Sequence, residues 1–448
     1  MELTRRAMVG GAAAAVIGRT VPGCTTPVPV RITRPVVVGP GAWCWFQSPR
    51  AAVLGDSLWL GSTQGTGAPR PGSVDVTCVR LRDLEVLERR SLAVDRVDDH
   101  TSPSVLATAG GLQVGWAAHR RLDWLEVGPV EGPLQRIVRP RAVAEPGRGT
   151  SYVSAHVVGG RRWILYRGES FSWNLLTSPD GQRWTPHGLV VAPPAGGHRP
   201  YVHAVSDGLR LHLLATDGNP SEQRGTSVVA GTVHADLQIT DATGRPCGRV
   251  GSAPPLPSTL TTVFAGEPGA REELDVDAWM CSLRLVDGRP VAVLSVREPH
   301  PPASDPTGAP RVGRWQHRYL WARQRADRSW AVSHLAWAGS ELYAGQPDYT
   351  GLASLDPTDA AHVVISTDVD PSTASPLVSE RDGAVHHELF EGHRSGGTWS
   401  WSPLTTNSIE DNLRPLVVAA GTRRLVAWMR GTYRHWTSFD TQLVVRDL

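Results

Sequence analysis

Short hydrophobic segments separated by turn residues fill most of the sequence, and this pattern limits the fold more than any other feature. The segments are rich in Val, Leu, Trp or Tyr, and Gly or Asp turns such as Asp207-Gly208 and Asp287-Gly288 precede them. Runs of this kind are typical of β-strands joined by tight turns, whereas long stretches with helical periodicity are nearly absent. The sequence therefore predicts an all-β fold, with strands in Ala51–Leu60, Gly111–His119, Arg162–Arg167, Leu209–Ala215, Arg289–Val296 and Arg424–Met429.

One kind of turn recurs along the chain. In the run Thr177–Trp184 (TSPDGQRW), we expect Asp180 to cap a hairpin turn and Trp184 to pack against a neighbouring sheet. Asp327–Trp330 and Gly396–Trp399 look like eroded copies of this turn. Repeated hairpin sheets that each carry one tryptophan-anchored turn are typical of a β-propeller.

The chain length fits seven such units. Removing the first 35 of 448 residues leaves about 413, or about 59 for each of seven blades. We therefore predict a seven-bladed β-propeller of four-stranded antiparallel blades over residues 36–448. A pair of β-sandwiches is the alternative.

The composition excludes several classes of protein. The chain contains no lysine, so all 45 basic residues are arginine, which rules out a P-loop lysine and lysine Schiff-base chemistry. The formal net charge is +2, and no block of like charge suggests nucleic-acid binding. No apolar run reaches the roughly 18 residues of a membrane span.

The N-terminus has the features of an export signal. Arg5 and Arg6 precede an apolar stretch at Ala7–Gly18, which is the order found in a twin-arginine signal. Val21–Cys24 (VPGC) then resembles a lipoprotein box in which Cys24 would be lipidated. We expect residues 1–35 to be a signal and linker, and the protein to be secreted or a cell-surface lipoprotein that meets the membrane only through that lipid. A disordered tail is the alternative.

The remaining cysteines form no recognisable metal or redox motif. They are Cys44, Cys78, Cys247 and Cys281, and none belongs to a CxxC or Cys/His zinc pattern. Export would permit disulfides without indicating a pairing. We predict no metal site and no required cofactor. The Asp-rich turns at Asp98-Asp99 and Asp368–Asp370 could hold a structural calcium, although solvated turns are the simpler interpretation.

Nine motifs follow one another in an order that matches a known group of proteins. They are Trp43–Arg50 (WCWFQSPR), Asp98–Pro103 (DDHTSP), Arg199–Tyr201 (RPY), Asp217–Pro220 (DGNP), Asp277–Trp279 (DAW), His317–Tyr319 (HRY), Tyr349–Leu352 (YTGL), Asp411–Pro415 (DNLRP) and Trp428–Tyr433 (WMRGTY). From Gly41 to Val445 the chain resembles the BNR-4 family of seven-bladed propellers. That family includes ulvan lyases, and lyases and hydrolases that act on rhamnose–glucuronate linkages.

The resemblance implies a polysaccharide lyase acting on a uronate-containing glycan, as a monomer. β-Elimination removes the C5 proton of a uronate and expels the sugar attached at O4. It requires a base, an acid for the leaving oxygen, and cations that neutralise the carboxylate. Histidine suits the proton steps, and arginine suits the carboxylate.

The family pattern implies roles for seven residues. His119 and Tyr152 correspond to proton-transfer residues whose order is open, and His100 to a positioning or proton-transfer residue. Arg167 and Arg199 would hold the carboxylate, and His317 and Arg318 are expected to line the same central face. Each of these residues also has an ordinary structural interpretation, as a packed strand residue or a solvated loop residue.

Two departures from the family pattern leave alternatives open. Glu222–Val233 has lost the Asn-Ser and Tyr-His pattern usual after the DGNP segment, which would suit a non-catalytic propeller that binds glycan. A hydrolase releasing L-rhamnose is the other alternative. The hydrolase branch is thought to use a histidine on the opposite face, where this chain has Gln47, and glutamine cannot carry a proton.

Overall fold

The computed structural model describes residues 31–120, 124–138, 149–168, 171–194, 199–299 and 315–448. Ile32–Leu448 forms one compact unit. The twin-arginine pair and Cys24 lie outside the described residues. Within the described part of the chain, no helix has the length and apolar character needed to cross a membrane.

The compact unit is an all-β, seven-bladed propeller, as predicted. Six blades are four-stranded antiparallel sheets, and the first strands of successive blades contact one another around a closed ring. In chain order the first three blades are β2 (Ala51–Leu54), β3 (Ser57–Thr63), β4 (Ser73–Arg80) and β5 (Val86–Val94); β6 (Ser104–Thr108), β7 (Gly111–Ala117), β8 (Trp124–Pro129) and β9 (Gln135–Val138); and β10 (Ser151–Val158), β11 (Arg161–Arg167), β12 (Trp173–Ser178) and β13 (Thr185–Leu189).

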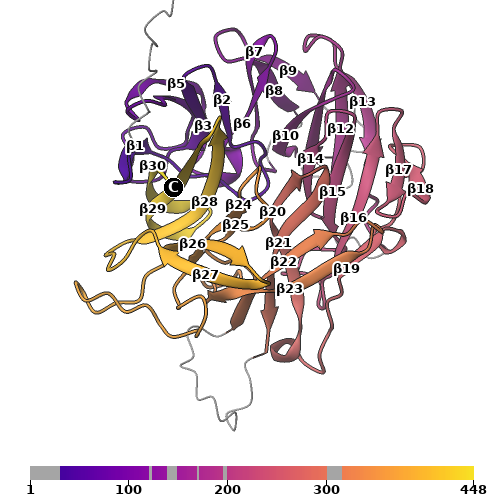
Figure 1. Cartoon of the computed structure of the whole chain (residues 1–448). Coiled ribbons are helices and arrows are strands. Elements are labelled where there is room, and N and C mark those ends of the chain that lie inside the picture. Colours follow the sequence, from indigo (N-terminus) through magenta and orange to yellow (C-terminus); the bar gives the residue numbers. More distant parts are fainter. Residues whose placement is uncertain (1–30, 121–123, 139–148, 169–170, 195–198, 300–314) are drawn as a thin grey trace, which may run out of the picture. The chain divides into compact units, whose positions relative to one another are not determined.

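The remaining blades complete the ring (Figure 1). They are β14 (Val202–Ser206), β15 (Arg210–Thr216), β16 (Val228–His234), β17 (Gln238–Asp241), β18 (Pro246–Arg249) and β19 (Thr261–Phe264); β20 (Asp277–Val286), β21 (Arg289–Glu298), β22 (Gln316–Gln324) and β23 (Trp330–Gly339); β24 (Ala353–Leu355), β25 (His362–Thr367), β26 (Glu388–Ser395) and β27 (Thr398–Pro403); and β28 (Asp411–Ala420), β29 (Arg423–His435), β30 (Ser438–Asp447) and β1 (Val36–Pro40).

The last blade is assembled from both ends of the propeller sequence. β1 pairs antiparallel with β30, and Val36 lies opposite Val445. Figure 1 shows this N-terminal strand beside the C-terminal strand in one sheet. The pairing closes the ring, so that the last blade is completed by the first strand.

The blade that contains β14 differs from the predicted four strands, because it has six. The outer edge of β16 is divided between two partners. Val228–Ala230 pairs with β19, and Gly231–Val233 pairs with β17. The edge position of this blade is therefore filled by two short strands in succession, with β18 beyond β17.

The predicted tryptophan-anchored turns occupy equivalent positions in their blades. Each joins the third strand to the fourth: Thr177–Trp184 joins β12 to β13, Asp327–Trp330 joins β22 to β23, and Gly396–Trp399 joins β26 to β27. In the first of these turns, the Asp180 carboxylate accepts hydrogen bonds from the backbone N–H groups of Gln182 and Arg183, each at 2.9 Å. Trp184 packs against a buried cluster that joins β7 and β8 of the preceding blade to β10, β11 and β12 of its own blade.

The predicted strand at Ala51–Leu60 is a hairpin instead. β2 and β3 are joined at Gly55, which has a φ of +60°. The segment is apolar on both sides of this glycine, which hides the turn in a hydropathy pattern. Both strands belong to the first blade, so the number of blades is unaffected.

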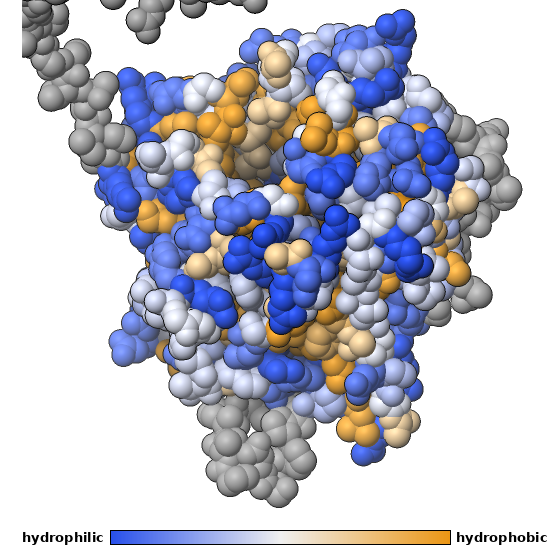
Figure 2. Space-filling view, turned by 45° about the vertical axis from the view of Figure 1, so that its right-hand side comes forward, coloured by the Kyte–Doolittle hydropathy of each residue, from blue (hydrophilic) through white to orange (hydrophobic). Residues whose placement is uncertain are grey.

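Large aromatic side chains are buried in the core. Six tryptophans are fully buried: Trp43, Trp45, Trp163, Trp173, Trp279 and Trp428. The surface in Figure 2 mixes hydrophilic and hydrophobic residues over the face that it shows. The four cysteines within the described residues are free thiols.

Candidate active site

Four predicted site residues meet at one end of two neighbouring blades. His100 lies on a short 3-10 turn, η1 (Asp99–Thr101), just before β6, and His119 follows β7. Tyr152 is near the start of β10, and Arg167 ends β11. Because β6 and β7, like β10 and β11, are antiparallel, each first strand begins where the second ends. Contact between β6 and β10 then brings all four side chains together.

One buried carboxylate, that of Asp98, holds both histidines. Its Oδ1 lies 3.0 Å from Nδ1 of His100, and its Oδ2 lies 3.0 Å from Nδ1 of His119. The Asp98 side chain also accepts the backbone N–H of His100 at 3.0 Å, which caps the 3-10 turn. The two rings stack with centroids 4.0 Å apart and an angle of 2° between them. Both side chains are therefore fixed by one residue.

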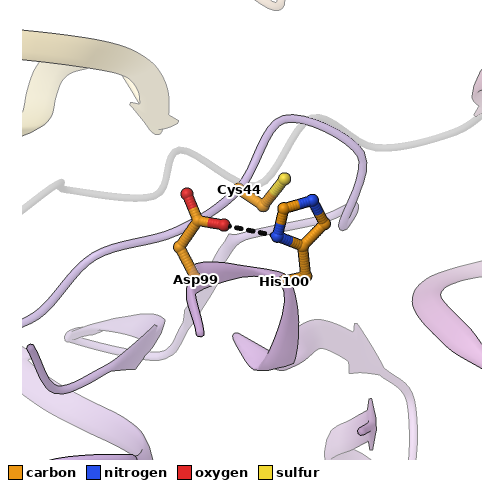
Figure 3. A group of neighbouring side chains, drawn as sticks. All are labelled: Cys44, Asp99 and His100. Carbon is orange, nitrogen blue, oxygen red and sulfur yellow. Dashed lines mark ion pairs between the residues drawn. The ribbon is translucent and has the colours of Figure 1, made fainter. Parts of the chain in front are cut away.

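A second carboxylate distinguishes His100 from His119. Figure 3 shows the Asp99 carboxylate directed at the His100 ring, with the Cys44 sulfur nearby. Oδ1 of Asp99 lies 2.7 Å from Nδ1 of His100. Its Oδ2 accepts hydrogen bonds from Nη1 of Arg414 at 2.6 Å and from the Tyr433 hydroxyl at 2.5 Å. The Asp99 carboxylate beside His100 is thus held in place by two residues of the last blade.

The two histidines have opposite pKa shifts. Burial alone would lower the pKa of His100, but the Cys44 sulfur and the Asp99 and Asp98 carboxylates outweigh it and hold this pKa well above 6.5. For His119, burial lowers the pKa, repulsion from His100 lowers it further, and Asp98 only partly offsets both, so the pKa lies well below 6.5. At neutral pH, His100 is therefore protonated and His119 is neutral. With Nδ1–H of His119 donated to Asp98, its Nε2 carries the lone pair.

Tyr152 lies beside this pair in an uncommon backbone conformation. Its φ is +56°, within a bulge that shifts the register between Ser151 and Ser154. The ring stacks on Trp173 with centroids 5.7 Å apart, and it is only 1% exposed. Burial raises the pKa of Tyr152 well above 10, and the nearby Tyr201 raises it further. The hydroxyl therefore remains protonated and can act as a proton donor. A positive φ at a bulky residue costs free energy and often marks a functional position.

Arg167 and Arg199 converge on the Tyr201 hydroxyl. Nη1 of Arg167 donates to it at 3.1 Å, and Nε of Arg199 donates at 3.4 Å. Burial would raise the pKa of Tyr201, but the two guanidinium groups outweigh it and lower this pKa below 10. Tyr201 appears in the RPY motif, yet it was not predicted as a site residue. Its role depends on two arginines brought together only by the fold.

The two arginines differ in how they are neutralised. Arg167 is 1% exposed, and within the described residues its Nε has no hydrogen-bond partner and no carboxylate pairs with it. Arg199 is more accessible and forms an ion pair with Glu222, with a shortest N–O distance of 2.5 Å. Glu222 opens the segment that departs from the family pattern. That segment therefore supplies an internal carboxylate to one of the two arginines predicted to bind the substrate's carboxylate.

His317 and Arg318 are not brought into this cluster. Nδ1 and Nε2 of His317 lie 3.1 and 2.6 Å from the backbone oxygens of Gly339 and Pro347. Arg318 forms an ion pair with Glu298 at 2.5 Å. Both side chains bind other parts of the chain around the blade of β20–β23. Two aromatic residues were also missed: Trp436, which makes an edge-type contact with both histidine rings, and Tyr433, which donates a hydrogen bond to Asp99.

Gln47 separates this cluster from a second cavity. Its Nε2 donates to the backbone oxygen of His100 at 2.5 Å, and the residue also lines a cavity of about 370 Å³. Arg50, Arg284 and His203 line the same cavity, and no acidic residue does. Nε2 of His203 and Nε of Arg284 have no hydrogen-bond partner within the described chain. This cavity is therefore cationic.

The candidate calcium positions are held by hydrogen bonds. Asp368 accepts the Ser340 backbone N–H at 3.0 Å and the Ser340 hydroxyl at 2.5 Å. Asp370 accepts the backbone N–H groups of Ser372 and Thr373 at 2.9 and 2.8 Å. Asp370 therefore stabilises its own loop, whereas Asp368 holds its loop to the residue that follows β23.

The fold is similar to solved carbohydrate-active propellers. An ulvan lyase of polysaccharide lyase family PL25, bound to the unit GlcA(1-4)Rha3S, has a TM-score of 0.58 and 10% identity, covering 93% of this chain and 96% of that one. The polysaccharide lyase Uly1 has a TM-score of 0.56 and 9% identity, covering 94% and 100%. This chain has the fold of those lyases. An α-L-arabinofuranosidase from Fusarium graminearum is similar at a TM-score of 0.41 and 11% identity, covering 92% and 97%. No protein-family model and no curated protein matches the sequence.

Proposed function

We propose that this protein is a polysaccharide lyase that cleaves a uronate-containing glycan by β-elimination. The observation that carries the proposal is the stacked histidine pair on Asp98, with one ring protonated and the other neutral, beside a buried tyrosine and arginine. These are the groups that the reaction requires. A rhamnose–glucuronate linkage is the proposed target. The PL25 ulvan lyase that shares this fold is bound to a glucuronate–rhamnose unit, which supports the choice.

The protonation states suggest an order for the two proton transfers. Neutral His119 would take the C5 proton on Nε2, because its Nδ1–H is held by Asp98. Tyr152 would give its proton to the leaving O4 oxygen, since its raised pKa keeps the hydroxyl protonated until the sugar departs. The C5–H electron pair then forms the C4–C5 double bond as the C4–O4 bond breaks. The products are an unsaturated uronate and a new sugar hydroxyl.

The cations would stabilise the carbanion-like transition state. As C5 loses its proton, charge spreads onto the uronate carboxylate, where fixed positive groups lower the barrier. Protonated His100 and buried Arg167 supply such groups without reorganisation. Arg199 would join them once the substrate displaces Glu222.

Ultraviolet absorbance of the unsaturated product tests this function. The chain from residue 36 onward would be incubated with rhamnose–glucuronate glycans, with and without sulfate, and with neutral arabinan as a control. We expect absorbance to rise only with the uronate glycans, and to stay flat for His119→Ala. A flat trace for the wild type with no released sugar, but with glycan retained on a gel, would instead identify a non-catalytic binding propeller.

A hydrolase releasing L-rhamnose is the second candidate, and the cationic cavity behind Gln47 favours it. Arg50 and Arg284 in that cavity suit an acidic sugar. Two histidines line the cavity, but neither holds a proton to donate near neutral pH, because burial lowers the pKa of His203 to about 3 and that of His156 to about 4. Reducing sugar released without ultraviolet absorbance would support this activity. Its loss in Arg284→Gln but not in His119→Ala would place it in the cavity.

We further propose that the protein is exported through its twin-arginine segment and anchored through Cys24. The basis is the sequence pattern of Arg5-Arg6, the apolar stretch and the VPGC box. Cell fractionation tests both steps. Replacing Arg5 and Arg6 together with glutamine should keep the protein inside the cell. Replacing Cys24 with alanine should release it from the membrane fraction into the medium.

A further inference from the structure

Outside the site described above, three side chains on two adjacent strands converge in the blade of β24–β27. They are His362, the first residue of β25, and Glu391 and His393 on β26. His362 lies directly opposite His393 in the antiparallel register, and Glu391 is two residues from His393, on the same face of the strand. One candidate ligand atom from each residue lies within 4.8 Å of the other two. We propose that these residues form a binding site for a divalent transition-metal ion of the zinc class.

The distances between ligand atoms suit one small ion. Nε2 of His362 lies 2.9 Å from Oε1 of Glu391, and Nε2 of His393 lies 3.4 Å from the same oxygen. Two ligands bound tetrahedrally to zinc at about 2.1 Å are about 3.4 Å apart, a separation that the His393–Glu391 pair already has and the His362–Glu391 pair approaches. The rings of the two histidines are parallel, with centroids 4.5 Å apart. A rotation of the exposed His393 ring would therefore complete the set around one ion.

His362 is held as a metal ligand would be. Its Nδ1 lies 3.0 Å from Oδ2 of Asp356, which fixes the orientation of the ring and leaves Nε2 facing Glu391, where a metal ion would take the place of the Nε2 proton. Asp356 is itself held by Nε of Arg424 at 2.8 Å and by the Thr358 amide at 2.7 Å. A carboxylate that accepts a hydrogen bond from the other ring nitrogen is a recurring support for histidine ligands.

Exposure and charge also suit a bound ion. The side chain of His362 is 7% exposed and that of Glu391 19%, whereas that of His393 is 58% exposed. The ion can therefore enter from solvent, and water can complete its coordination. Two neutral imidazoles and one carboxylate suit zinc, nickel or copper better than calcium or magnesium. The nearby Arg446 acts electrostatically on Glu391 and would be partly offset by Asp447.

Without metal, the same atoms can form a hydrogen-bonded chain from Asp356 through His362 to Glu391, so the test must separate the two roles. The variant His393→Ala removes a metal ligand but leaves both hydrogen bonds of His362 intact. His334→Ala removes an exposed histidine on β23 and serves as the matched control. Zinc titration of the propeller chain by calorimetry would be compared among wild type, His393→Ala, Glu391→Gln and His334→Ala.

We expect the wild type and His334→Ala to bind one more equivalent of zinc than the other two variants. Counting equivalents matters because Asp98, His100 and His119 also lie close together. Copper(II) should give an electron paramagnetic resonance spectrum with nitrogen coupling that is lost in His393→Ala. Equal zinc stoichiometry in the wild type and His393→Ala would overturn the proposal, as would equal thermal stabilisation by calcium and zinc. Unfolding temperatures without metal would confirm that each variant is folded.

Discussion

The imidazole rings of His100 and His119 lie face to face, 4.0 Å apart, and each contacts a different carboxylate oxygen of Asp98. Two imidazolium rings at this distance repel each other, so protonating one ring opposes protonation of the other. The Cys44 sulfur and Asp99 act on His100 and not on His119, and together they favour the charge on the His100 ring. The pair therefore holds a base and a cation side by side at one pH.

Removing the shared carboxylate should abolish most activity. In Asp98→Asn, the side chain has only one oxygen that can accept a hydrogen bond, and it has no negative charge. The tautomer of His119 and the charge of His100 are then no longer fixed. We expect kcat to fall about 100-fold or more, within the range for losing acid–base catalysis. The ultraviolet assay measures it. Asp56→Asn, in the exposed turn between β2 and β3, should retain full activity. A similar loss in both variants would contradict the positioning role.

The profile of kcat/KM against pH should be bell-shaped, with a broad plateau around neutral pH. His119 must be neutral, and its lowered pKa places the acid limb well below 6.5. His100 must be protonated, and its raised pKa places the alkaline limb well above 6.5. A profile of kcat/KM against pH for the wild type tests this, and a single transition centred near 6.5 would contradict it.

The same shifts set the pH dependence of stability, with opposite signs. The stabilisation from His100 is complete below 6.5 and is lost as pH rises through its raised folded pKa. For His119 the folded state resists protonation, so stability is lost as pH falls from 6.5 toward its lowered folded pKa. Denaturant unfolding of His100→Gln and His119→Gln, compared with wild type across pH, should show these windows separately. A destabilisation of either variant that does not vary with pH would contradict the assignment.

Tyr152→Phe should lose turnover and keep its fold. The phenylalanine ring can still stack on Trp173 and face Arg167, whereas the proton donor for O4 is gone. We expect kcat to fall about 100-fold with little change in KM. Tyr343→Phe is a matched control, because within the described residues the buried Tyr343 hydroxyl has no hydrogen-bond partner. A substrate with a good leaving group at O4 should restore part of the rate of Tyr152→Phe, and no such recovery would argue against the acid role.

Glu222→Gln should strengthen binding of uronate substrates. Its carboxylate neutralises Arg199, and Glu222 is about two-fifths exposed, so the ion pair contributes at most about 1 kcal/mol. Freeing the arginine should lower KM about 2- to 5-fold with kcat unchanged. Steady-state kinetics on a uronate oligosaccharide measure this, with Glu410→Gln as a surface control. A raised KM would indicate that Glu222 binds substrate directly.

Much of the fold could be predicted because blade turns and strands are local patterns. Asp180 and Trp184 lie four residues apart, and their contacts form within a single hairpin. The extra strands beside β16 could not be predicted in this way. β19 comes about 30 residues after the stretch of β16 that it pairs with, and the two are matched only in three dimensions.

The candidate site was predictable to the extent that its motifs are contiguous. The segment Asp98–His100 contains both a histidine and the carboxylates that orient it, so its role could be inferred from neighbouring residues. The contact between Asp99 and Arg414 joins residues more than 300 positions apart. Arg199 pairs with Glu222, the first residue of a segment that lacks the family pattern, so the motifs could not indicate this contact. His317 shows the limit of motif matching, since both its ring nitrogens contact backbone oxygens instead of the cluster.

The pairing of β1 with β30 has a consequence for the synthesis of the protein. Val36 leaves the ribosome about 400 residues before Val445, its partner. The last blade therefore cannot be completed until all seven blades have been translated. Until then, both ends of the unfinished ring present unpaired strand edges, which are prone to aggregate. Interrupted translation should for this reason lead readily to aggregation of the unfinished chain. The nascent chain would also depend on chaperones for longer than a protein whose domains fold one after another.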